Sequence, residues 1–226
     1  MTGLRLSVVY QEMKLRTIVV TRSGACHVKT LHTILRCNIK SLQTEGVQHE
    51  IAFVNDDPYE KSECIEKSMK THDRIFFLDF GIHVDDKSLS VVFEPNENMN
   101  VIVFPAVMDG IDWVMFKEKV KSGSKEPTNQ MGMHFDTDVS SCINDSYYNV
   151  KSTCAKTWVM MCKPTLKHLK CRRTGDVKIH PKSKVMFEKF KESGVKIAAY
   201  TAANILITYT HECVGNILNS AGIKSS

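Results

Sequence analysis

The sequence predicts an α/β protein of three layers, in which helices cover both faces of a central sheet that is mixed but mostly parallel. Three observations predict it. Strand-like and helix-like segments alternate through the first half of the chain, the strands are continuous apolar runs, and the helices carry apolar residues at helical spacing. Strand, helix, strand, helix and strand follow one another within about 65 residues, which is typical of parallel βαβ units with right-handed crossovers.

The first strand is expected at residues 16–21, RTIVVT, because the run is continuous and β-branched, as in strands that are covered on both faces. The segment RSGACH ends it. A helix is expected next, and Gly46 is the kind of residue that commonly follows a helix end. The apolar residues that define this helix recur at intervals of three and four: Val28, Leu31, Leu35, Ile39 and Leu42.

The second strand is expected in HEIAFVNDD, residues 49–57, and the third in RIFFLDF, residues 74–80. Between them, Asp57 can cap a helix, Pro58 suits its first position, and Glu60 can complete a capping box. The residues that this helix is expected to turn inward are Cys64, Ile65 and Met69.

The second half of the chain continues the alternation, with a polar loop at Lys121–Met133. Trp113 and Trp158 lie in amphipathic runs and are expected in the core. Further strands are expected at residues 100–107, 157–162, 176–180 and 195–200, and further helices at 87–93, 113–120, 164–170, 181–194 and 211–222. No repeat and no linker divides the chain, so one domain is expected over residues 1–226.

The composition excludes several classes of protein. With 42% hydrophobic and 24% charged residues, wholesale disorder is not expected. No apolar run approaches the roughly 20 residues of a membrane span, and no secretory signal is apparent, so we expect a cytoplasmic protein whose eight cysteines are free thiols. The net charge of +5 is spread along the chain, which suits an anionic ligand such as a nucleotide and does not indicate a nucleic-acid partner.

Polar residues follow the first three predicted strands. In open parallel sheets, ligands bind outside the carboxyl ends of the strands, and such side chains can hydrogen-bond the base and ribose of a nucleotide. The alternative is that they are turn and cap residues, which we prefer for Asp57 and which leaves Asp56 without a structural role. The candidates are Thr21, Arg22 and Ser23 after the first strand, Asn55 and Asp56 after the second, and Asp79 after the third.

Asp79 follows four apolar residues, and an acid so close to a core strand is costly unless it is paired or holds a metal ion. A salt bridge to Arg22 or Arg74 is the structural alternative. A second pair of carboxylates, Asp136 and Asp138, follows the polar loop and is itself a literal DxD sequence, so it is an alternative metal site.

The segments VVTRSG, IAFVNDD and FFLDFGIHVDDKSL resemble, in order and spacing, the nucleotide-sugar glycosyltransferases of the GT-A fold. The resemblance is good over about the first 110 residues and loose beyond them. Small members encoded by large algal DNA viruses have a similar length. In this family, the polar turn and the acid pair contact the nucleoside, and the third strand ends in the DxD metal motif.

The resemblance implies a hexosyltransferase that moves a sugar from a UDP- or GDP-sugar donor to a glycan or glycoprotein acceptor. Residues 1–110 would form the nucleotide-binding half and residues 111–226 the acceptor-side half. Asp79 would hold Mn²⁺ or Mg²⁺ with His211, and Asp136 or Asp138 would be the general base. The second DxD acid is replaced by Gly81, which puts the metal in doubt.

Two alternatives stay open. A nucleotidyltransferase shares the fold but attacks the α-phosphate, and it would need a glycine-rich, basic loop where the chain offers only Arg22 and Gly24. A non-catalytic nucleotide- or carbohydrate-binding protein could have kept the sheet and lost the second metal acid, as Gly81 suggests. The sequence does not predict the oligomeric state.

Overall fold

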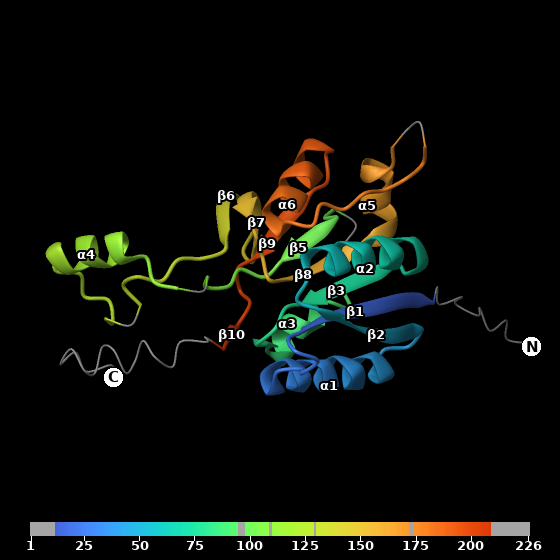
Figure 1. Ribbon diagram of the computed structural model, residues 1–226, viewed down its shortest axis with the longest axis horizontal. Coiled ribbons are helices and arrows are strands. Elements are labelled where there is room, and N and C mark those ends of the chain that lie inside the picture. The colour runs from blue at the N-terminus through green and yellow to red at the C-terminus, as the bar shows by residue number, and fades with distance from the viewer. Residues whose placement is uncertain (1–11, 95–97, 109, 129, 172–173, 209–226) are drawn as a thin grey trace, which may run out of the picture.

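The first three strands form the parallel end of an eight-stranded sheet, as predicted (Figure 1). β1 (Met13–Thr21) pairs in parallel with β2 (Val47–Asn55) on one side and with β3 (Arg74–Leu78) on the other. The crossovers are the predicted helices, α1 (Val28–Gln43) and α2 (Pro58–Thr71). This computed structural model describes residues 12–94, 98–108, 110–128, 130–171 and 174–208.

The remaining strands make the sheet mixed, and its order is β2-β1-β3-β8-β5-β9-β7-β6. β8 (Thr157–Met161) runs antiparallel between β3 and β5 (Val101–Val103), and β9 (Ile197–Tyr200) runs parallel to β5. The hairpin of β6 (Thr137–Asn144) and β7 (Tyr147–Thr153) closes the far edge. Following the pairings, six strands point one way and β7 and β8 point the other, so the predicted mixed, mostly parallel sheet is confirmed.

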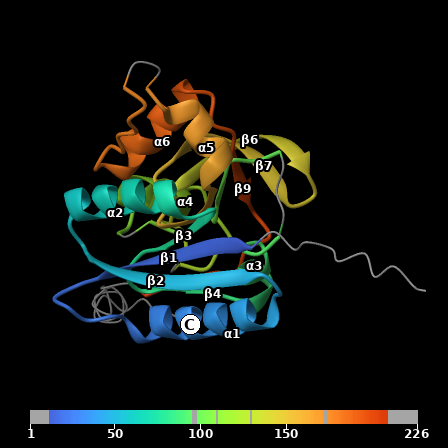
Figure 2. The same cartoon turned by 90° about the vertical axis from the view of Figure 1, so that its right-hand side faces the viewer.

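Helices cover both faces of the sheet, and each face has its own core (Figure 2). On one face α2, α5 (Cys162–Leu169) and α6 (Ser183–Glu192) cover a core that includes Ile65, Trp158 and Phe187. The other face is covered by α1, by α3 (Asp86–Ser90) and by a small antiparallel sheet of β4 (Ile82–Val84) and β10 (Ile205–Ile207).

Some expected elements differ from those observed. The segment 176–180 is not a strand, and the β6–β7 hairpin was not predicted, because its exposed residues lack a buried apolar run. The helix expected at 211–222 lies outside the described residues. Among the part of the chain that the structure describes, no helix is long and apolar enough to cross a membrane.

The helix expected around Trp113 is present as α4 (Trp113–Lys121), which lies apart from the layers at one end of the molecule (Figure 1). None of its residues is buried, and Trp113 is half-exposed, so its predicted place in the core was wrong. Trp158 is 1% exposed and stacks on Phe77, as a core residue should.

The largest departure from expectation concerns α1. The helix forms where predicted, but its apolar stripe faces away from the sheet, whereas such a stripe normally faces the core. The side that faces the sheet buries mostly small residues, which are Thr30, Thr33, Ile34, Cys37 and Ser41.

Candidate functional site

The connection between β1 and α1 is a tight turn at the carboxyl edge of the sheet. Arg22 and Ala25 exchange backbone hydrogen bonds of 3.1 and 2.9 Å, and Ser23 and Gly24 between them have positive φ angles of 50° and 72°. This geometry exposes Ser23 to solvent at the edge. Thr21, by contrast, is buried, and its hydroxyl donates to a carbonyl of β2 at 3.1 Å.

Asp56, at the end of β2, is held between two cations. Its carboxylate accepts from Arg22 Nε at 2.9 Å and from Lys61 Nζ at 2.7 Å. Partial burial opposes ionisation, but the two hydrogen bonds prevail and lower the pKa of Asp56. The expectation that Asp56 has no structural role was therefore wrong, because it joins the β1 turn to α2. Its neighbour Asn55 donates to Glu60 Oε2 at 3.0 Å.

Asp79 lies directly after β3, where its backbone N–H donates to the carbonyl of Lys156 at 3.1 Å. Burial raises the pKa of its carboxyl, while the Phe80 N–H, which donates to Asp79 Oδ1 at 2.8 Å, and the charge of Lys61 act in the opposite direction. The structural alternative was a salt bridge to Arg22 or Arg74. Neither is formed, since Arg22 pairs with Asp56 and Arg74 donates to the backbone carbonyl of Val92.

The Phe80 ring, at the end of β3, packs against residues of the turn after β1. The Arg22 guanidinium lies 4.9 Å from the centre of the Phe80 ring, and the ring of His27 meets Phe80 edge-on at 5.4 Å between centroids. Because Arg22 also pairs with Asp56, the structure brings Arg22, Asp56 and Asp79 into one cluster at the carboxyl edge.

A cavity of about 240 Å³ adjoins this cluster between α2, β3, β8 and α6. Asp79 supplies its single carboxylate and three lysines also line it, of which Lys61 pairs with Asp56, so its lining carries a net positive charge. Its polar lining residues are Lys61, Ser62, Asp79, Lys156, His180, Lys182 and Ser183. A small, positively charged cavity at a strand end fits an anionic group such as a phosphate.

The basic residues of this cavity were missed by the sequence reading. Their shared signal is position: Lys61 is in the first turns of α2, Lys156 directly precedes β8, and Lys182 is the N-cap residue of α6. Each of these lysines lies at the start of a helix or strand. Nothing in the sequence shows that the starts of α2, β8 and α6 meet.

The described residues around Asp79 do not form a divalent-cation site by themselves. Gly81, at the second DxD position, has a φ of 77°, and a Cβ there would lie 3.4 Å from the carbonyl oxygen of Thr208. A second acid at this position would be strained by the positive φ of the turn and would contact the chain that follows β10. Among the described residues, no group of three or more His, Cys, Asp and Glu side chains could hold a metal. His211, the predicted partner of Asp79, lies outside the described residues.

The carboxylates of Asp136 and Asp138 differ in access. Asp136 is 4% exposed and accepts hydrogen bonds from Ala106 N–H at 3.1 Å, Thr137 Oγ1 at 2.8 Å and Lys156 N–H at 3.3 Å. Burial raises its pKa against these hydrogen bonds. Its geometry suits positioning of the segment before β8. Asp138 is exposed on β6 and accepts from Ser152 Oγ at 2.7 Å.

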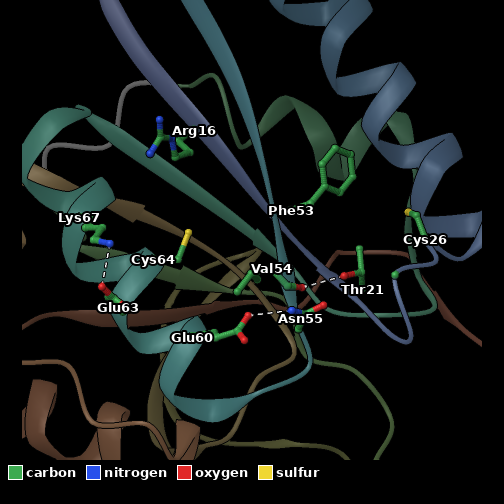
Figure 3. Close-up of a pocket in the computed structure, with 11 residues that line it drawn as sticks. Arg16, Thr21, Cys26, Phe53, Val54, Asn55, Glu60, Glu63, Cys64 and Lys67 are labelled. Carbon is green, nitrogen blue, oxygen red and sulfur yellow. Dashed lines mark hydrogen bonds and ion pairs between the residues drawn. The ribbon is translucent and has the colours of Figure 1, made fainter.

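A larger cavity, about 760 Å³, runs along the outer edge of β2 (Figure 3). It extends from Arg16 and Lys67 to Gly24 and Cys26 at the carboxyl edge, and Phe53 and Asn55 contribute to its wall. It therefore touches the predicted nucleoside residues only at one end, and the rest of it is lined mainly by β2 and α2.

No protein family model and no curated protein sequence matches the chain. Among solved structures, A197 from STIV has a TM-score of 0.50 at 11% identity, covering 87% of this chain and 86% of its own. HddC from Yersinia pseudotuberculosis has a TM-score of 0.46 at 8% identity, with 91% and 99% covered. The galactosyltransferase LgtC, solved with donor and acceptor sugar analogues, has a TM-score of 0.35 at 10% identity, with 81% and 72% covered.

At 11% identity, what the chain shares with A197 is the fold alone. The predicted fold class, three layers around a mixed sheet, is confirmed by the strand order and by the match to A197.

Proposed function

We propose that the chain is a transferase whose donor is a nucleoside-diphosphate sugar bound at the carboxyl edge of the sheet. The observation that carries this proposal is the cationic cavity at the end of β3, in which Asp79 is the single carboxylate. The cavity lies beside the turn after β1 and the end of β2, which supports a donor whose nucleoside and phosphates bind along one continuous edge.

In this proposal the nucleoside lies over the exposed side chains of Ser23 and Asn55, next to Arg22. Thr21 and Asp56 support this edge through the contacts described above. The diphosphate would occupy the cationic cavity, where Lys61, Lys156 and Lys182 stabilise the negative charge that develops on the leaving group. Asp79 would accept a hydrogen bond from a sugar or ribose hydroxyl, since it is the acceptor among these donors.

Mn²⁺ or Mg²⁺ remains part of the proposal through Asp79 and His211. Such an ion would neutralise diphosphate charge when bound. The described residues offer such an ion one carboxylate among lysines. We therefore propose that the lysines of the cavity stabilise the charge of the leaving group.

On the acceptor side, we propose Asp138 as the general base, because its carboxylate is exposed while that of Asp136 is buried and hydrogen-bonded to backbone. The acceptor would be a glycan or glycoprotein, and the donor would be a UDP- or GDP-hexose. The loop at 121–133 would close over the bound donor as a lid. We also propose that the protein is cytoplasmic and is encoded by a virus.

A nucleotidyltransferase is an equally good candidate on the geometry, because a cationic cavity that binds diphosphate also suits an activated nucleotide. The two activities release different products. A glycosyltransferase releases a nucleoside diphosphate from a nucleotide sugar, whereas a nucleotidyltransferase releases pyrophosphate from a nucleoside triphosphate and a sugar phosphate. A non-catalytic binding protein would bind nucleotide and release neither.

The test is thermal unfolding of the full chain with UDP, GDP, UDP-glucose and GDP-mannose, each with and without Mn²⁺. A ligand at 100 times its Kd adds about 2.7 kcal/mol to the free energy of unfolding. Lys61→Met and Asp79→Asn should remove the shift, and Lys29→Met, a change at an exposed lysine of α1, should not. If no nucleotide shifts the transition, the proposal is wrong. Assays for released diphosphate and pyrophosphate then separate the three activities.

A further inference from the structure

The outer face of α1 is an apolar seam without a covering element among the described residues. Its five residues recur at intervals of three, four, four and three, which is the spacing by which one helix packs against another. Their exposed fractions are 77% for Val28, 43% for Leu31, 54% for Leu35, 56% for Ile39 and 81% for Leu42. A surface helix with this pattern normally turns it inward.

β2 is the outermost strand at the same end of the sheet, and it pairs with β1 on one side. Its nine residues, Val47–Asn55, include no proline, lysine or arginine. Its one carboxylate, Glu50, is engaged by Arg16 at 2.5 Å and by His72 at 3.1 Å. Edge strands usually carry charges, prolines or bulges that prevent further pairing, and of these β2 carries only the ion-paired Glu50.

The seam and the strand edge form one surface. His49 of β2 contacts Thr17 Oγ1 at 2.8 Å through Nε2 and Asn38 Oδ1 of α1 at 3.3 Å through Nδ1, so its side chain lies on the α1 side of the sheet. Alternate residues of a strand share a face, which places Ile51 and Phe53 on the same side. These two side chains are 38% and 60% exposed.

Arg36 and Lys40, two of the three cations of α1, do not interrupt this surface. Arg36 forms an ion pair with Asp86, and Lys40 Nζ lies 2.5 Å from the Asp86 carbonyl and 2.5 Å from Ser90 Oγ. These contacts are with α3, whereas Asn38 contacts β2, so the charged side of α1 is turned away from the edge strand.

We propose that a second copy of this chain covers this surface, with β2 beside β2 and α1 against α1 across a twofold axis. A twofold axis makes antiparallel strand pairing and antiparallel helix packing from one surface that appears on both copies. Seven large apolar side chains, each 38% to 81% exposed, form one patch of the kind that marks an interface, and a stable interface buries roughly 800 Å² per partner. The charge-free seam supplies the apolar centre that such an interface requires.

The test is the molar mass of the full chain in solution, measured by light scattering after size exclusion and by sedimentation at about 1 to 100 µM, because a dimer is concentration-dependent. The wild type is expected to be a dimer. The double variant Leu35→Glu with Leu42→Glu should weaken association by about 100-fold or more, since the interface would bury unpaired charges. Gln43→Glu, an exposed neighbour outside the seam, is the matched control and should remain dimeric.

Circular dichroism and the unfolding transition at low concentration show whether the double variant still folds. A monomeric wild type over the whole concentration range overturns the proposal. If that monomer is also destabilised by the double variant, the seam is covered within one chain. A dimer that survives the double substitution overturns it too, because another surface then holds the copies together. Nucleotide binding is measured separately, so failure here leaves the proposed function standing.

Discussion

The two crossover helices of the first βαβαβ unit pack on the sheet in opposite ways. α2 turns Ile65 and Met69, which are 4% and 1% exposed, into the core, as its sequence predicts. α1 has the stronger apolar pattern, but it exposes most of that pattern and buries mostly small residues instead. The comparison shows that an apolar stripe identifies a packing surface without saying which partner it packs against.

The contacts between α1 and the other elements on its face are largely hydrogen bonds. Thr33 Oγ1 accepts from the backbone N–H of Val84 at 3.0 Å and lies 3.2 Å from His83 Nδ1. Cys37 Sγ lies 3.9 Å from Thr17 Oγ1 on β1. Small side chains allow the helix to approach closely enough for such bonds, whereas α2 is held mainly by apolar burial.

The largest expected effect on stability comes from a substitution in the core beneath α2. Met69→Ala should lower the free energy of unfolding by about 2–5 kcal/mol, because the side chain is buried and its removal leaves a cavity. Leu35→Ala on α1, where the side chain is 54% exposed, should cost less than about 1 kcal/mol in the monomer. Urea unfolding at low protein concentration measures both, and equal losses would contradict the comparison.

Much of the fold was predictable because its strands have one possible place in the protein, the centre of the core. The strands around Ile18, Phe76 and Val159 are continuous apolar runs, and only a strand covered on both faces can bury them. The candidate site was predictable in part, because the ends of parallel strands must meet, which identified Arg22, Asp56 and Asp79.

The rest of the site depends on long-range geometry. The lysines of the cavity come from α2, the start of β8 and the N-terminus of α6, and sequence spacing does not show that these meet. The outward stripe of α1 could not be predicted either, because the pattern is the same whether the core or a second molecule covers it.

A smaller effect is expected from the buried threonines of α1. Thr33→Val keeps the shape but leaves the Val84 N–H without its acceptor, so the free energy of unfolding should fall by about 1–3 kcal/mol. Thr30→Val is the matched control, because the Thr30 hydroxyl is buried and has no hydrogen-bond partner in the described structure. This control should be neutral or stabilising. If the two substitutions cost the same, hydrogen bonding does not hold α1 to its neighbours.

The helix caps should differ by less. Asp57 Oδ1 accepts from the N–H groups of Tyr59 and Glu60 at 2.9 Å each, so Asp57→Ala should cost about 1 kcal/mol. Asp57→Asn keeps the acceptor and should cost less. In α1 the cap is His27, whose Nδ1 accepts one N–H, that of Lys29, at 3.1 Å. His27→Ala should therefore lower the free energy of unfolding by less than Asp57→Ala in the same urea measurement. The reverse order would show that the number of capped N–H groups does not decide the strength of the cap.

The smallest effect concerns Asp79, which lies on the α2 side of the carboxyl edge, and its sign depends on pH. Burial raises the pKa of this carboxyl in the folded chain, so its neutral form is favoured there. Below the unfolded pKa, about 3.9, wild type and Asp79→Asn should unfold at the same urea concentration. As the pH rises through the folded pKa, ionisation costs the folded state more than the unfolded state, and the wild type loses stability relative to the variant.

At pH 7, Asp79→Asn should therefore be the more stable protein while losing nucleotide binding, a combination expected of a residue retained for function. The gain should be small because Lys61 and Lys156 offset part of the cost of burying the charge. Asp138→Asn, which removes an exposed carboxylate, is the matched control for the substitution itself. A variant that is less stable than wild type at pH 7 would mean that the lysines outweigh burial, and Asp79 would then be a structural ion-pair partner of the α2 side.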